Sequence, residues 1–322
     1  MIRRILLLIG LALFAYLIYR LGPGQILATL LQLGWNFLAV VLIFAIQVLL
    51  RAAALHRCIL RERACSYWDA LRIRLSGEAV HHLTFTGPVL AEPSKAWLLK
   101  RRGLKVEEAV AAVLNEYLIH AFTSAALSVA GLGYLILHFP INRPLWIAAV
   151  ITVAALMLFL LASSIAITFR IYLIGAVVGA VTRLPLLKTY RPDMRRVHDM
   201  EDLLLEILRE RPTRFASIVL IELAAQALLI VELMWMLSAM GVDTPWSHPL
   251  VIEAGAKITG TAFFFVPGQV GVAEGVYIAL ANALSLPSAA GFTLSFVRRL
   301  RSQVVAALGM ATFWFLSGDQ PR

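Results

Sequence analysis

Residues 265–274 read FVPGQVGVAE, and residues 84–92 read TFTGPVLAE. Both segments place Gly and Pro, which interrupt helices, shortly before an Ala-Glu pair, and both lie within strongly apolar sequence. At membrane depth, broken backbone is tolerated only where protein buries it or where it lines a polar cavity, because lipid cannot hydrogen-bond its amides. The two segments therefore predict the tips of two helical hairpins.

The composition predicts an all-α integral membrane protein. Of 322 residues, 60% are hydrophobic and 15% are charged, with a mean hydropathy of +0.81. Soluble domains carry charge on about 25% of their residues. Continuous apolar runs at 5–19, 35–50, 145–168 and 215–240 approach the ~20 residues that cross a bilayer core.

The basic residues predict the orientation. Ten Lys and Arg lie in 57–105 and nine in 170–214, whereas 240–249 holds none. This alternation follows the positive-inside rule and predicts that both termini lie on the cytoplasmic side of the membrane. The net charge of +10 is thereby assigned to anionic headgroups at the cytoplasmic face rather than to nucleic acid.

About six transmembrane helices are expected, at about 3–20, 34–56, 107–138, 145–169, 213–240 and 288–316. The first of these follows two arginines, as a signal peptide would, but no cleavage site follows it, so we interpret it as a retained helix. The linker 170–212 is expected on the cytoplasmic surface. Within it, Leu203, Leu204, Ile207 and Leu208 repeat with the spacing of an amphipathic helix.

Two remaining regions, 70–101 and 249–286, are too long for loops and predict re-entrant hairpins that enter from opposite faces. The chain then forms an inverted repeat, with 34–138 as the first unit and 213–316 as the second. The register agrees, since Glu92 and Glu116 have the same separation in sequence as Glu274 and Arg298. Broken segments at corresponding positions of two halves indicate a transporter's binding site near the bilayer midplane.

Four segments carry a resemblance to a known family. TGPVLAEPSKAWLLKRRGL, EEAVAAVLNEYLIH, FVPGQVGVAEGVYIA and FVRRLRSQVVAALG resemble the lysylphosphatidylglycerol synthase transmembrane-region family, including its stand-alone flippase-like members. PGQVGVAE is the most specific of them, with Gln269 in place of a usual Gly, and the first hairpin is more divergent. The resemblance implies translocation of a phosphate-bearing or modified lipid without lipid synthesis, since no aminoacyltransferase domain is apparent.

Ionisable residues inside a membrane are costly and are candidates for function. The predicted substrate-binding residues are Glu92, Lys95, Glu116, Lys257, Gly268, Gly271, Glu274, Arg298 and Arg299. Further ionisable candidates are Glu78, Glu222, Glu253 and Arg301, with Glu222 balanced between packing and function. Glu232 is discounted, because it lies near the outer end of its helix and is expected to reach water.

Glu92 and Glu274 each follow a kink and open a half-helix. In one interpretation they cap the helix N-terminus. In the other they face a central cavity, where they titrate or hold a cation, while the free amides at 89–91 and 270–273 bind a phosphate. Lys95 is expected either to draw a headgroup toward the first hairpin or to contribute only to the positive-inside charge.

Arg298 and Arg299 lie about ten residues into an apolar helix, near mid-membrane. A guanidinium presents a fork that matches phosphate oxygens. The alternative is an internal salt bridge to Glu116 or Glu274. The two are compatible if substrate and carboxylate compete for the same arginine, which would allow proton coupling.

Other classes of site are disfavoured. Glu78, His81 and His82 lack the further ligands of a di-iron site, so a structural or cavity-lining role is preferred and no metal or cofactor is expected. Cys58 and Cys65 are expected to be free thiols. None of the six Asp lies within a predicted span, which weakens the alternative of an integral-membrane enzyme of, for example, hopanoid or polyprenyl metabolism. An accessory subunit of such a pathway is the other alternative.

Overall fold

The computed structural model describes residues 33–61, 64–83, 88–169, 193–262 and 271–318, with isolated residues 19, 24, 31, 172, 175, 178 and 269. Every regular element within this part of the chain is helical, so the all-α prediction is confirmed. Several predicted features lie outside the described residues: the helix at 3–20, most of the linker up to residue 192, and the kink segments 84–87 and 263–268.

Five long helices follow the apolar runs closely. They are α3 (Trp35–Cys58), α6 (Val106–His138), α7 (Arg143–Thr168), α10 (Pro212–Ala239) and α13 (Ser288–Gly318). The first four are long and apolar enough to cross a membrane. α13 is equally long but carries three arginines near its centre, which require partners inside the protein. The chain is thus a multi-pass membrane protein.

Local sequence explains where these helices begin and end. α7 starts after Asn142, whose side chain accepts a hydrogen bond from the Leu145 amide at 3.0 Å, and Pro stands in its first turn. α10 ends at Ala239. Gly241, just beyond it, has a φ of +73° and lets the Val242 amide bond back to the Leu237 carbonyl at 2.9 Å. These caps satisfy backbone groups at the helix ends.

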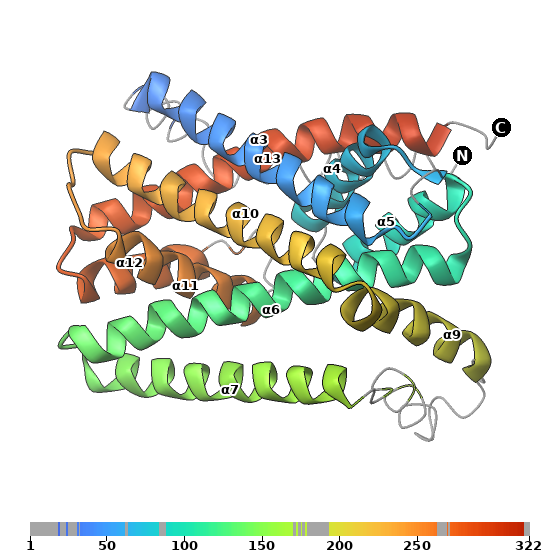
Figure 1. Ribbon diagram of the computed structural model, residues 1–322. Coiled ribbons are helices and arrows are strands. Elements are labelled where there is room, and N and C mark those ends of the chain that lie inside the picture. The colour runs from blue at the N-terminus through green and yellow to red at the C-terminus, as the bar shows by residue number, and fades with distance from the viewer. Residues whose placement is uncertain are drawn as a thin grey trace.

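Two pairs of shorter helices occupy the predicted hairpins. α4 (Tyr67–Leu83) packs with α5 (Pro88–Arg101), and α11 (Ser247–Ala262) packs with α12 (Val272–Ala283). Figure 1 shows the two pairs toward opposite ends of the long helices. α4 also packs against α13, and α11 against α6, so each pair lies on the long helix that follows the other pair. Re-entrance and the inverted repeat stay predictions.

Glycines allow this close packing. A Cβ on Gly131 of α6 would lie 2.6 Å from the Ala254 Cβ and 2.9 Å from the Leu250 carbonyl oxygen of α11. A Cβ on Gly309 of α13 would overlap the Leu75 carbonyl of α4. α6 therefore packs closely against the backbone of α11, and α13 against the backbone of α4, because glycine has no side chain at these contacts.

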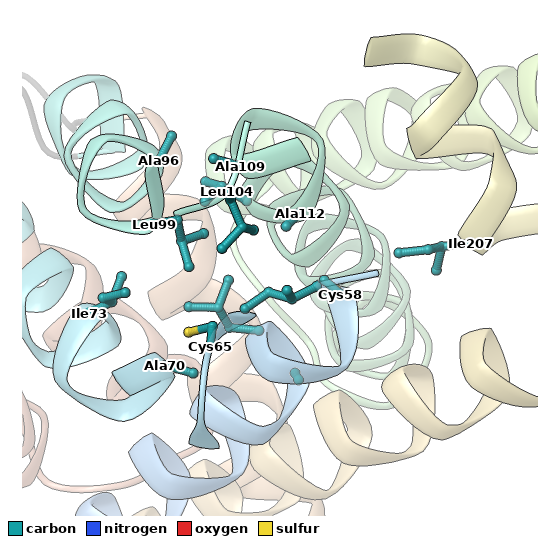
Figure 2. Packing of buried hydrophobic residues seen from close by; sticks show 14 of the residues in the cluster. Cys58, Cys65, Ala70, Ile73, Ala96, Leu99, Leu104, Ala109, Ala112 and Ile207 are labelled. Atoms are coloured by element: carbon teal, nitrogen blue, oxygen red, sulfur yellow. The ribbon is translucent and has the colours of Figure 1, made fainter. Parts of the chain in front are cut away.

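An apolar core holds the α4–α5 end together. Its residues come from the end of α3, from α4 and α5, and from the start of α6. The π-helical turn η2 (Glu206–Glu210) adds Ile207 and Leu208 (Figure 2). The helix α9 (Met194–Leu205) packs against α6. Leu204, Ile207 and Leu208 are buried and Leu203 is partly buried, as the predicted amphipathic pattern requires.

α7 stands apart from this packing. It runs beside α6 (Figure 1), and among its residues only Ala149 and Ala166 are buried. Its exposed aliphatic and aromatic surface suits contact with lipid.

Candidate functional site

Glu116 on α6 is fully buried and is the centre of a first charged network. Its Oε1 accepts hydrogen bonds from Arg51 Nη2 at 2.6 Å and Arg74 Nη1 at 3.1 Å, and its Oε2 accepts one from Lys95 Nζ at 2.9 Å. The three cations belong to α3, α4 and α5, respectively. One carboxylate of α6 thus connects that helix with α3, α4 and α5.

Two further carboxylates complete this network. Arg74 pairs with Glu78 one turn along α4, and Glu78 also lies 3.3 Å from His82 Nε2. Lys95 Nζ lies 2.7 Å from Glu92 Oε2. The Glu92 side chain is 19% exposed, whereas Lys95 is almost fully buried, so Glu92 is at the accessible edge of the network.

Arg298 on α13 is the centre of a second network. Its Nη1 donates to Glu253 Oε2 at 2.6 Å and to Tyr277 Oη at 3.0 Å. Its Nη2 donates to the Leu229 carbonyl at 2.9 Å and to Glu232 Oε2 at 3.2 Å. Each terminal nitrogen therefore already has two acceptors, which leaves the fork of Arg298 little capacity for a ligand.

The two networks have the same plan with opposite charge. In each, a long helix carries a central charged residue that binds one side chain from each of three preceding helices. Glu116 binds Arg51, Arg74 and Lys95 from α3, α4 and α5. Arg298 binds Glu232, Glu253 and Tyr277 from α10, α11 and α12.

A separate ion pair lies at the start of α12. Arg299 pairs with Glu274 and donates from Nη2 to the Gln269 carbonyl at 3.2 Å. Glu274 Oε2 also accepts from the Gly271 amide at 2.7 Å. Gly271 has a φ of +87°, a conformation that favours glycine, so its amide is turned toward this carboxylate. Glu274 thus caps the N-terminus of α12 and also pairs with Arg299.

Some of the partners expected for these charges are correct and others are wrong. The pairing of an arginine with Glu274 is correct for Arg299. Glu116 is not the partner of Arg298, which binds Glu253 instead. Depth in a helix does not fix which face a side chain occupies.

Lys257 and Glu232 are also placed. Lys257 lies 3.2 Å from Glu253 within the second network. The expectation that Glu232 reaches water is wrong: it is fully buried and pairs with Arg298 and Arg301. The face of α10 that carries Glu232 meets α13, whose arginines require counter-charges. Gly268 lies outside the described residues.

Arg51 and Arg74 are network residues that the sequence reasoning missed. Both are buried against Glu116. Arg51 lies just before the basic 57–105 region and Arg74 lies within it, so both resemble positive-inside charge. One sequence signal could have identified Arg74. In α4, Arg74 and Glu78 are one turn apart, and in α11, Glu253 and Lys257 are one turn apart with the opposite order of charges.

The networks are balanced in charge. In the described part of the chain, the two networks, the Glu274–Arg299 pair and the nearby Glu222 together contain seven carboxylates and seven cations. These are Glu78, Glu92, Glu116, Glu222, Glu232, Glu253 and Glu274 with Arg51, Arg74, Lys95, Lys257, Arg298, Arg299 and Arg301. Burial of so many charges is tolerated because each has a partner.

The carboxylates at the starts of α5 and α12 are partly accessible. Glu116 is fully enclosed, as is most of Arg298, whereas the Glu92 and Glu274 side chains are 19% and 12% exposed. Glu92–Lys95 and Glu274–Arg299 are called the tip pairs below. In each of them the carboxylate is partly accessible, as Glu78 and Lys257 also are at 12% and 13% exposure.

One comparison with known proteins gives a match. The family model described as the lysylphosphatidylglycerol synthase TM region matches residues 4–309, a range that contains both networks and both tip pairs. No curated protein and no solved structure matches the chain.

Proposed function

Since the chain belongs to the lysylphosphatidylglycerol synthase TM region family, we propose that it moves a phosphate-bearing or modified lipid across the bacterial cytoplasmic membrane. The two helix pairs are then re-entrant hairpins of an inverted repeat, with the tip pairs as headgroup sites near the midplane. The observation that carries this proposal is the accessible Glu274–Arg299 pair beside the Gly271 amide.

This pair offers a lipid phosphate the groups it needs. A phosphate that replaces Glu274 receives the Arg299 guanidinium and the amide at the start of α12. When the lipid leaves, Glu274 takes the guanidinium back. Carboxylate and lipid therefore compete for one cation, which lets the site bind and release without leaving a buried charge unpaired.

The first tip pair offers an equivalent step on the other half. Lys95 is held by Glu92 at 2.7 Å and by Glu116 at 2.9 Å. A phosphate that displaces Glu92 leaves Lys95 anchored to Glu116. The helix pairs lie at opposite ends of the bundle, so the two tip pairs suit a lipid arriving from either leaflet (Figure 1).

We expect Glu274→Gln and Glu92→Gln to lower lipid translocation about tenfold or more while the protein stays folded. Gln keeps the shape of the side chain but loses the charge that displaces phosphate, so release slows. Translocation of tail-labelled phosphatidylglycerol is measured in proteoliposomes, together with its binding affinity. Binding should persist or tighten as the rate falls. Glu206→Gln, on the partly exposed η2 turn, is the matched control.

Normal rates in both tip variants would contradict the competition mechanism. Lipid extracted after the assay is also chromatographed. A chemically altered product that needs active protein would identify an enzyme of lipid metabolism instead of a transporter.

The orientation is tested by cysteine labelling, which the native thiols permit. Cys65 is 1% exposed, and burial raises its pKa to about 12, so at neutral pH it lacks the reactive thiolate. We expect wild type to resist maleimide in intact cells, Asp243→Cys to be labelled from outside, and Asp193→Cys to require permeabilisation. The opposite pattern for the two new cysteines would invert the topology.

A further inference from the structure

A polar group beside the first network lies at the contact of α6 with α10. Glu222 on α10 is fully buried, with Oε2 at 2.8 Å from His120 Nδ1 and Oε1 at 3.5 Å from Arg51 Nε. Beside it, Gln226 Nε2 donates to Ser124 Oγ at 2.8 Å. From the starts of their helices, His120 and Glu222 lie about 21 Å and about 15 Å deep at 1.5 Å per residue. The group is therefore near mid-membrane.

Two buried acceptors in this group lack a hydrogen-bond donor. They are Glu222 Oε1 and Gln226 Oε1, and Arg51 Nε has no acceptor either, as far as the described chain shows. Glu222 and Gln226 are one turn apart on the same face of α10. Buried polar atoms are normally satisfied. Because Oε1 accepts no hydrogen bond, and Oε2 faces a ring nitrogen that can accept as well as donate, Glu222 can take up a proton without losing a hydrogen bond.

We propose that Glu222 is a proton-binding site and that His120 delivers its proton, an inference that rests on the transport function proposed above. The His120 side chain is 23% exposed, whereas Glu222 is enclosed, so the ring connects the carboxylate with accessible space. A proton binds Nε2, and Nδ1 then passes its own proton to Glu222. The ring returns to neutral with its proton on Nε2, and the carboxylate becomes a neutral acid.

The surrounding charges link this site to the first tip pair. The charged groups facing Glu222 and His120 are Arg51 from α3, Glu116 from α6 and Lys257 from α11. Arg51 contacts both Glu222 and Glu116. When Glu222 is neutral, Arg51 has one carboxylate partner instead of two. Its full charge then acts on Glu116, which competes less strongly for Lys95.

The proton site is tested by infrared spectroscopy on the purified chain in lipid nanodiscs, titrated between alkaline and acidic pH. Wild type should gain the C=O stretch of a buried carboxylic acid, and Glu222→Gln should lose that band. Glu206→Gln, which removes a partly exposed carboxylate in the η2 turn before α10, should retain the band. Size-exclusion profiles establish that each variant is folded. A band unchanged by Glu222→Gln would overturn the proposal.

His120→Gln supplies a second, independent readout. The acid band should appear more slowly after a pH jump, because the ring no longer delivers the proton. In proteoliposomes, the ratio of translocation rates at two pH values should fall to about one for Glu222→Gln. An unaltered ratio, or unaltered kinetics after the jump, counts against the site.

The two proposals fail separately. If wild type shows the Glu222 band but moves no lipid, the transport function is wrong and the proton site stands. If lipid moves and the band is independent of Glu222, transport stands and this site is wrong.

Discussion

Replacing Glu116 by glutamine is expected to lower the free energy of unfolding by about 3–5 kcal/mol, the cost of breaking a buried ion network. The carboxylate is bound by Arg51, Arg74 and Lys95, and one oxygen accepts from two guanidinium groups. Glutamine keeps the volume but offers one acceptor oxygen and no charge. Three buried cations then share too few counter-charges. Thermal unfolding in detergent, followed by tryptophan fluorescence, measures the loss.

A double variant makes this prediction specific. Adding Lys95→Met removes one of the three cations that have lost Glu116, so the double variant should be destabilised by less than the sum of the single variants. Glu274→Gln is the comparison on the other half. It removes a partner of Arg299, whose side chain is only 7% exposed, so it should also destabilise the protein, but less than Glu116→Gln, because one ion pair is lost rather than three. Strict additivity of the two first-network variants would show that Glu116 does not hold Lys95.

Gly309→Val is expected to destabilise the protein by about 3 kcal/mol, the upper part of the range for overpacking. A Cβ at this position overlaps the Leu75 carbonyl and comes within 3.0 Å of the Ala79 Cβ. A backbone carbonyl cannot rotate away as a side chain can, so α13 and α4 must separate. Folded yield and thermal midpoint are the measurements.

The control is a glycine with open space. A Cβ on Gly133 of α6 meets nothing within 4 Å. Gly133→Ala should therefore be neutral or stabilising by up to about 1 kcal/mol, through helix propensity alone. Equal losses at the two positions would mean that backbone flexibility, and not the contact with α4, determines the effect of Gly309.

The sequence predicted the helices well and their partners poorly, for one physical reason. An apolar run must be about as long as the bilayer is thick, so α3, α6, α7 and α10 end within a few residues of the predicted limits. The two pairs of shorter helices flank the segments where Gly and Pro interrupt the apolar sequence. These features depend on local sequence and on the solvent, both of which can be read from one chain.

Which charged side chains pair depends on how the helices are rotated and packed against each other. That arrangement cannot be read from a local stretch of sequence. Arg51 resembled a positive-inside charge because its partner, Glu116, is 65 residues away. Glu232 was expected in water because its distance from the helix end was considered and its facing helix was unknown. The Arg299–Glu274 pair is one of the alternatives that the sequence offers, and it joins α12 and α13, which are adjacent in the chain.

The balance of seven carboxylates with seven cations has an electrical consequence. A membrane potential does work only on net charge that moves across it, about 2.3 kcal/mol per elementary charge per 100 mV. Exchange of partners within a neutral set moves little charge. For the proposed transport cycle, the voltage then acts on the lipid and its accompanying proton alone. An anionic lipid carried with one proton crosses as a neutral unit, and its distribution follows the pH difference rather than the voltage.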